Sequence, residues 1–151
     1  MDLTEVPELV IWPETYYVFI EKVGPFSMSA PEAWGQAHKL LPDLTLHNRV
    51  TGYLSVYKVW SKTYRAGFAL EAPPSELPKG LNYEKFDGGR YSKFTLTGPY
   101  TQLPQASGRV FELIEEQGIE TREDWYIENY VTDPSVTPAE KLQTEILVPT
   151  K

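Results

Sequence analysis

An internal repeat is the feature that most constrains how this chain can fold. Three pairs of sequence blocks correspond to one another, with offsets of 74, 73 and 73 residues: 23–26 with 97–100, 31–36 with 104–109, and 53–57 with 126–130. The first pair is a Gly-Pro turn, and the third pair begins and ends with tyrosine. Because three separated blocks keep nearly the same offset, the sequence predicts two copies of one structural unit.

Both halves predict the same order of secondary structure. Segments 15–22 and 90–96 are rich in β-branched and aromatic residues, which indicates strands, and each is followed by a Gly-Pro pair. Apolar residues at helical spacing predict helices that begin near Pro31 and Pro104 and end at Pro42 and Gly118. The closing strands are expected at 50–59 and 64–71, and at 125–131 and 144–148. A capping box at 137–140 predicts a short helix between the last two.

The predicted fold class is therefore α+β. Two pseudo-twofold-related β-α-β-β units, at about residues 15–72 and 88–149, are expected to form an antiparallel sheet with the helices on one face. A proline-rich linker at about residues 72–82 joins them. We expect a single domain spanning residues 1–151, because a unit of about 70 residues buries too little apolar surface to be stable alone.

Composition limits the classes of partner and the compartment. The chain has 21 acidic and 14 basic residues and a net charge of −7, which argues against direct nucleic-acid binding and suits a cationic partner. It has no cysteine, no signal-like N-terminus and no apolar run long enough to cross a membrane, so we expect a cytoplasmic protein without a membrane partner. His38 and His47 lack the spacing of metal ligands, so neither a metal nor a cofactor is expected.

The strand predicted at 125–131 carries the candidate binding site. Side chains alternate along a strand, so Tyr126, Glu128 and Tyr130 share one face. The matching face of the first half carries Tyr53, Ser55 and Tyr57. Tyrosine rings around one carboxylate suit a cation, because the rings present negative faces and the carboxylate supplies the charge. The alternative is a surface glutamate beside tyrosines that pack a core, and the pattern leaves both open.

Segments along nearly the whole chain carry a family resemblance: residues 17–26, Trp34, and residues 89–94, 98–100, 128–134 and 144–149. Together they resemble the gyrase-inhibitor-like small-molecule-binding superfamily, which includes the effector-binding domains of multidrug-sensing bacterial transcription activators. The nearest similarity is to stand-alone, integron-cassette-type drug-binding modules. The resemblance implies an effector-binding domain with a central ligand cleft, in which Glu128 is the buried acid of a Glu-x-Tyr motif that meets cationic ligands.

The resemblance also implies that aromatic residues such as Tyr57 and Tyr130 line this cleft. The expected ligand-binding residues are Glu128, Tyr130, Tyr126, Tyr57, Tyr53, Tyr91, Trp34 and Trp60. The expected ligand is a small lipophilic aromatic molecule that carries positive charge. Many relatives have a DNA-binding helix-turn-helix segment before this domain, but here the first strand is expected at about residue 15, which leaves no room for one.

Two function classes follow. The first is a binding module that captures or senses a lipophilic cation and passes any signal to a protein partner that the sequence does not identify. The second is a hydrolase, since some relatives hydrolyse reactive cyclopropane-bearing antibiotics and Glu128 could act as a general base. The sequence shows no group that would orient such a base, which favours binding. Inhibition of gyrase by protein contact is a third hypothesis, based on the family name alone.

Overall fold

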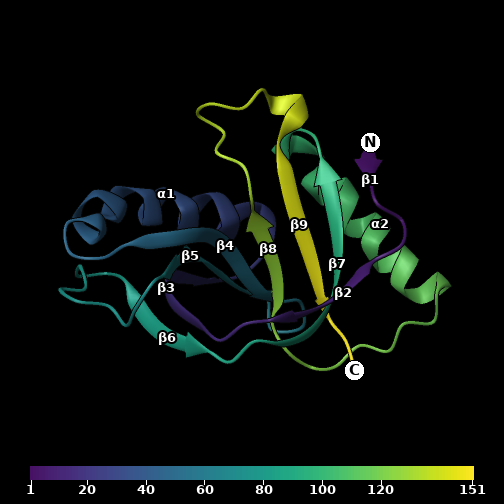
Figure 1. The fold of residues 1–151 in the computed structure, drawn as a ribbon, viewed down its shortest axis with the longest axis horizontal. Helices are drawn as coiled ribbons and strands as arrows, with labels where there is room; N and C mark the ends of the chain where they lie inside the picture. Colours follow the sequence, from purple (N-terminus) through teal and green to yellow (C-terminus); the bar gives the residue numbers. More distant parts are fainter. The chain divides into compact units, whose positions relative to one another are not determined.

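The computed structural model describes all of residues 1–151 and divides them into two compact units (Figure 1). Unit 1 comprises residues 1–12 and 89–151, and unit 2 comprises residues 13–88. Unit 2 therefore contains the first repeat and unit 1 the second. Both units combine antiparallel strands with one long helix, so the predicted α+β class is confirmed.

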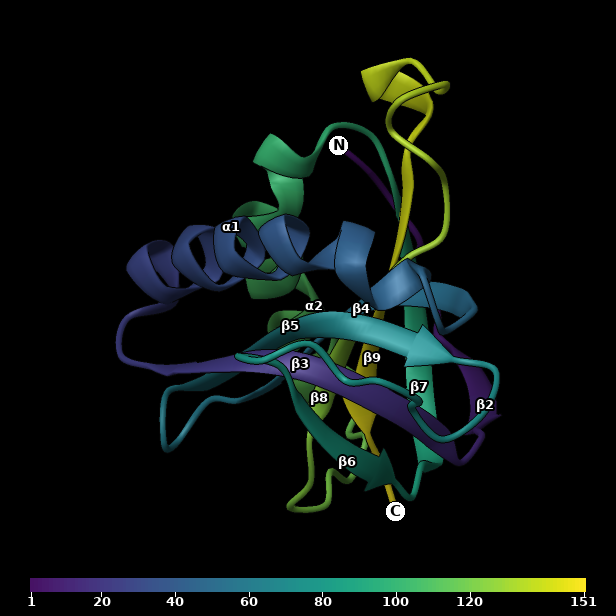
Figure 2. The ribbon, with the colours of Figure 1, turned by 90° about the vertical axis from the view of Figure 1, so that its left-hand side faces the viewer.

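Unit 2 holds a four-stranded antiparallel sheet. Its strands, in order across the sheet, are β6 (Asn82–Phe86), β3 (Thr15–Val23), β5 (Thr63–Leu70) and β4 (Val50–Lys58). Helix α1 (Phe26–Thr45) connects β3 to β4, and Figure 2 shows it lying along one face of the sheet, over β5 and β3. The predicted strands of this half are confirmed to within one or two residues at each end.

Helix α1 is longer than the sequence predicts. It begins at Phe26, directly after the Gly-Pro turn, and continues through Pro31 and Pro42 to Thr45. The prediction that Pro31 starts the helix and Pro42 ends it was therefore wrong. A proline inside a helix costs about 3 kcal/mol, because it lacks an N–H and crowds the preceding turn. The buried stripe of Ser29, Ala33, Ala37 and Leu44 continues across both prolines, and this packing outweighs the local preference.

Unit 1 repeats this arrangement. Its strands are β7 (Gly89–Thr97), which pairs with β1 (Asp2–Leu3) and β2 (Glu8–Trp12) on one side, then β9 (Gln143–Pro149) and β8 (Tyr126–Tyr130). Figure 1 shows β7, β9 and β8 side by side, with α2 (Leu103–Glu116) beside them. Two short 3-10 helices complete the unit: η1 (Tyr100–Gln102) and η2 (Ala139–Lys141).

The core of unit 1 lies between α2 and the sheet. Ala106, Val110, Leu113 and Ile114 of α2 pack against apolar residues of β7 and β9: Phe94, Leu96, Ile146 and Val148. Pro104 lies in the first turn of α2, and Gly118 follows the helix at a φ of 64°, so both predicted boundaries are confirmed. The helix expected at 137–140 is instead the three-residue η2, which follows Pro138 and has no side-chain cap.

The edge strand of each unit comes from the opposite half of the sequence. Strand β2 precedes β3 in the chain but pairs with β7, whereas β6 precedes β7 but pairs with β3. Glu8 of β2 lies opposite Lys93 of β7, and Asn82 of β6 lies opposite Phe19 of β3. Glu8 and Asn82 are 74 residues apart, and so are Phe19 and Lys93. The repeat therefore extends to these strands, which lie outside the units predicted at about residues 15–72 and 88–149.

Ion pairs attach both edge strands. Arg65 of β5 contacts Glu21 of β3 and Glu84 of β6, each at 2.8 Å. In unit 1, Lys93 of β7 contacts Glu8 of β2 at 3.1 Å and Glu145 of β9 at 3.2 Å. Each unit thus places one cation between two carboxylates, one of them on the edge strand.

Strand register confirms the equivalence of Tyr57 and Tyr130. In unit 2, Tyr57 pairs with Tyr64 of the neighbouring strand, and Tyr64 pairs with Lys22 of the next strand. In unit 1, Tyr130 pairs with Thr144, and Thr144 pairs with Leu96. Lys22 and Leu96 are themselves 74 residues apart, so the two tyrosines occupy the same place in their units.

Deleting residues 1–12 should destabilise unit 1, because it removes β2 and leaves the backbone of β7 unpaired on that side. A net loss of about 0.5–1.5 kcal/mol for each of several hydrogen bonds lowers the midpoint of urea unfolding clearly. Circular dichroism measures this midpoint, and deletion of residues 1–3, which removes only β1, is the control.

We expect a single unfolding transition for the full chain, and two separate transitions would contradict the single domain predicted over residues 1–151.

Candidate ligand-binding site

Glu128 lies on the face of β8 that α2 covers. It pairs with Ile146 of β9, whose side chain belongs to the core beneath α2. Side chains alternate along β8, so Tyr126 and Tyr130 share this face, and the fully buried Ile127 points to the other. The strand thus presents two tyrosines and one carboxylate together, as the alternation predicts.

Two hydroxyl groups hold the Glu128 carboxylate. The Tyr130 hydroxyl donates to its Oε1 at 2.9 Å, and Ser107 of α2 donates a second hydrogen bond. Burial of the carboxyl group raises the pKa of Glu128 above its ordinary value, because desolvation outweighs these two bonds, and no cationic side chain contributes. The residue as a whole keeps partial solvent exposure. The site therefore contains a carboxylate that is partly desolvated and lacks a positive partner.

Aromatic rings lie at both ends of this carboxylate. Tyr100 of η1 meets Tyr130 edge to face, with ring centroids 5.6 Å apart and an interplanar angle of 72°. At the other end, Phe111 of α2 lies 5.7 Å from Tyr126. Burial raises the pKa of Tyr100 and of Tyr126, so both remain neutral phenols at physiological pH. We refer to Glu128, Ser107 and these four rings as the acidic site.

Unit 2 repeats part of the aromatic geometry. Tyr57, the equivalent of Tyr130, meets Phe26 edge to face at 5.5 Å with an interplanar angle of 70°. Tyr53, the equivalent of Tyr126, is 38% exposed and packs edge-on against Phe68 at 5.1 Å. His38 takes the place of Phe111, and its ring centroid lies 6.4 Å from that of Tyr53. The repeat therefore preserves the edge-to-face contact made by Tyr57 and Tyr130, while the phenyl ring that meets Tyr126 is replaced by an imidazole.

The polar centre differs between the units. Ser55 takes the place of Glu128, and Trp34 of α1 takes the place of Ser107. The Trp34 indole N–H donates to Ser55 Oγ at 3.1 Å and to the Tyr64 hydroxyl at 3.0 Å, and the two hydroxyl oxygens are 2.5 Å apart. Unit 2 thus has a neutral hydrogen-bonded centre where unit 1 has a carboxylate.

Tyr91 and Trp60 lie away from these faces. Tyr91 pairs with Pro149, on the face of β9 opposite to the core beneath α2, and it is fully buried. Its hydroxyl donates to the Trp125 carbonyl at 2.7 Å, and the Arg122 guanidinium lies 4.8 Å from the centre of its ring. Trp60 lies in the turn between β4 and β5 and is 97% exposed.

Sequence reasoning missed three residues of the acidic site: Ser107, Tyr100 and Phe111. The repeat contained the signal that could have found them, because they match Trp34, Phe26 and His38 at offsets of 73 or 74 residues. The cleft expected between the halves stays a prediction.

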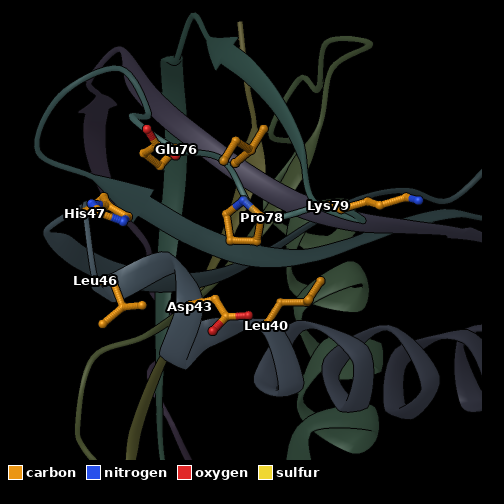
Figure 3. Close-up of a pocket in the computed structure, with 8 residues that line it drawn as sticks. Leu40, Asp43, Leu46, His47, Glu76, Pro78 and Lys79 are labelled. Carbon is orange, nitrogen blue, oxygen red and sulfur yellow. The ribbon is translucent and has the colours of Figure 1, made fainter.

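A separate hollow lies in unit 2, at the C-terminal end of α1 (Figure 3). It has a volume of about 400 Å³, and its lining comes from α1 with the turn after it and from residues 76–79: Leu40, Asp43, Leu46, His47, Glu76, Leu77, Pro78 and Lys79. Figure 3 shows Lys79 pointing away from the others. None of the expected ligand-binding residues lines this hollow.

No cluster of three or more histidine, aspartate or glutamate side chains is arranged to hold a metal ion. Neither α1 nor α2 combines the length and the apolar character that crossing a bilayer requires.

Comparison with solved structures finds the same fold in several proteins. The C-terminal domain of EcmrR has a TM-score of 0.78 and 16% identity, covering 100% of this chain and 99% of that one. SAV2435 bound to tetraphenylphosphonium has a TM-score of 0.74 and 19% identity, covering 100% and 94%. An integron cassette protein from the mobile metagenome of Vibrio cholerae has a TM-score of 0.64 and 13% identity, covering 100% of both chains.

At these identities the likeness establishes the fold and nothing beyond it. A search among curated proteins finds no match. The family model of the GyrI-like small molecule binding domain, however, matches residues 6–151, nearly the whole chain. The resemblance inferred from the sequence is therefore confirmed, and the chain belongs to the GyrI-like small-molecule-binding family.

Proposed function

We propose that the protein binds small lipophilic aromatic cations and that Glu128 recognises their charge. The observation that carries this proposal is the state of the carboxylate. It is partly desolvated, its pKa is raised, it has no cationic partner, and aromatic rings lie at both ends of it. A cation bound here offsets the cost of the desolvated negative charge. The related fold of SAV2435 was solved with tetraphenylphosphonium, a lipophilic aromatic cation, which supports the proposal.

The acidic site offers two kinds of attraction. Each ring whose face meets the cation contributes about 0.5–2 kcal/mol. A charged hydrogen bond or close ionic contact to the carboxylate contributes about 1.5–3 kcal/mol. Tyr130 serves both, because its ring flanks the site and its hydroxyl holds Glu128 Oε1 at 2.9 Å. Together these terms suit ligands that combine a delocalised or shielded charge with flat apolar surface.

The other residues expected from the sequence stay predictions. Tyr53, Tyr57 and Trp34 form the matching aromatic face of unit 2. Tyr91 is buried on the opposite face of its sheet and Trp60 is exposed in a turn, so neither forms part of the acidic site. The function proposed here depends only on the residues of unit 1.

Hydrolysis with Glu128 as general base is the second candidate. The raised pKa of Glu128 favours it, since a base works best when its pKa approaches the working pH. Tyr130 and Ser107 both donate to the carboxylate, however, and such bonds reduce its basicity. Incubation with a cyclopropane-bearing electrophilic antibiotic, followed by mass spectrometry, separates the two functions, because binding leaves the compound intact.

Glu128→Gln should weaken the binding of tetraphenylphosphonium by about tenfold or more, since it keeps the side-chain shape and removes the charge. Isothermal titration calorimetry measures the affinity. Phenyltrimethylammonium should lose affinity in the same way, whereas its uncharged isostere tert-butylbenzene should not. Tyr130→Ala should weaken the binding of both the charged and the uncharged ligand, because it removes ring area.

Glu115→Gln is the matched control for net charge, because Glu115 lies on α2 with its side chain exposed. This variant should bind the cations like the wild type. Equal weakening of the charged and uncharged ligands in Glu128→Gln would contradict the assignment of Glu128 as the charge-recognising group.

Glu128 should also make stability depend on pH in an unusual direction. Its pKa is higher in the folded than in the unfolded chain, so ionising it costs stability. The cost is absent at about pH 4, near the ordinary pKa of glutamate, and complete above the folded pKa. Glu128→Gln should therefore melt at a higher temperature than the wild type at about pH 8, and the difference should vanish toward about pH 4.

Thermal unfolding followed by circular dichroism at a series of pH values tests this dependence, with Glu115→Gln as the control. Saturating tetraphenylphosphonium should stabilise the wild type most where Glu128 is ionised. A Glu128→Gln variant that is less stable than the wild type at every pH would show that the carboxylate is a structural group and contradict the proposal.

A further inference from the structure

The two units place different side chains around equivalent polar centres. In unit 2, the indole of Trp34 and the phenol of Tyr64 both reach Ser55. The equivalent residues of unit 1 are Ser107, Thr144 and Glu128, in that order. An indole ring and a phenol ring in unit 2 thus correspond to the short side chains of a serine and a threonine in unit 1. Glu128 is larger than Ser55, but it replaces neither ring.

Thr144 has a buried hydroxyl group without a partner. The residue is 0% exposed, and its Oγ1 forms no hydrogen bond within the protein. It lies directly opposite Tyr130 on the face beneath α2, which makes it the diagonal neighbour of Glu128. In unit 2 the same diagonal is closed, because the longer Tyr64 brings its hydroxyl to 2.5 Å from Ser55 Oγ. Threonine is too short to do this, so Thr144 Oγ1 stays unpaired.

An unpaired buried hydroxyl is unfavourable, and proteins rarely keep one without a reason. At this position the reason is visible by comparison with unit 2. There, an aromatic N–H, that of Trp34, donates to both hydroxyl groups of the centre. Unit 1 keeps the hydroxyl and the surrounding rings but lacks that donor.

We propose that the ligand supplies the missing donor: the acidic site selects planar bicyclic aromatic cations whose ring N–H donates to Thr144 Oγ1, while the positive group faces Glu128. This inference rests on the proposed function, since it uses Glu128 as the anion. The ligand's ring system takes the place in unit 1 that the indole of Trp34 takes in unit 2. Because Thr144 is 0% exposed in the free protein, the ligand must displace the side chains that cover it. Thr144 is then a specificity residue, which distinguishes ligands with a ring donor from cations that have none.

Tryptamine is the direct probe, because it joins an indole N–H to an ammonium group. Its 1-methyl derivative keeps the charge and the ring system and lacks the donor. In the wild type, tryptamine should bind about three- to tenfold more tightly than 1-methyltryptamine, the range of one neutral hydrogen bond. In Thr144→Val, which removes only the hydroxyl, the ratio should fall to about one. Tetraphenylphosphonium has no donor and should bind both proteins equally.

Two more variants complete the experiment. Thr144→Ser keeps the hydroxyl and should keep the preference for tryptamine. Ser107→Trp reproduces the arrangement of unit 2 and should block both tryptamines, with circular dichroism showing that the fold is retained. Calorimetry measures the affinities, and comparison of the two ligands in each protein isolates the hydrogen bond from the bulk of the methyl group.

The stability of Thr144→Val is an independent readout. Because the hydroxyl has no partner in the protein, this variant should be at least as stable as the wild type. A clear fall in its melting temperature would show that the hydroxyl is satisfied internally and would overturn the inference.

Failure of the inference can be told apart from failure of the proposed function. If the ratio of the two tryptamines is the same in the wild type and in Thr144→Val, or if tryptamine does not bind, the inference is overturned. The proposed function survives either result as long as tetraphenylphosphonium binds and loses affinity in Glu128→Gln. If Glu128→Gln leaves cation binding unchanged, both are overturned.

Discussion

Each half of the sequence supplies the edge strand that pairs with the first strand of the other half. Because β2 pairs with β7 and β6 pairs with β3, the first strand of each repeat is flanked on both sides. A strand held on both sides cannot shift its register without turning its buried side chains to the opposite face. This fixes which residues of the following strands lie beneath each helix, and so brings Glu128 to the face under α2.

Conservation of the backbone allows the two polar centres to differ. The edge-to-face contacts of Tyr57 with Phe26 and of Tyr130 with Tyr100 are nearly identical, at 5.5 and 5.6 Å. Between the rings, Trp34 completes a neutral hydrogen-bond network in unit 2, while unit 1 holds a partly desolvated carboxylate. The polar centre of unit 2 thus satisfies its groups internally, whereas the centre of unit 1 keeps a negative charge without a cation and a hydroxyl without a partner. Unsatisfied groups of this kind are unfavourable in the free protein and become favourable when a ligand completes them.

Local properties made much of this predictable. Alternation along a strand places Tyr126, Glu128 and Tyr130 together whatever the rest of the chain does, and the repeat makes Tyr57 and Tyr130 equivalent. The boundaries of α2 follow from Pro104 and Gly118, because backbone restrictions act within a few residues. The family was recognisable as well, since its motifs lie along nearly the whole chain.

By itself, then, the sequence determined the repeated unit, the order of its main strands and helices, and the face that carries the carboxylate. The tertiary structure alone decided that β2 and β6 are strands, since their stability comes from partners far away in the chain. It also decided that α1 runs through Pro31 and Pro42, because packing against β3 and β5 outweighs a local preference. The hydrogen bond from Ser107 to Glu128 and the lack of a partner for Thr144 Oγ1 were also decided by the tertiary structure. They depend on which side chains a helix and a sheet bring within about 3 Å, a distance that no local pattern encodes.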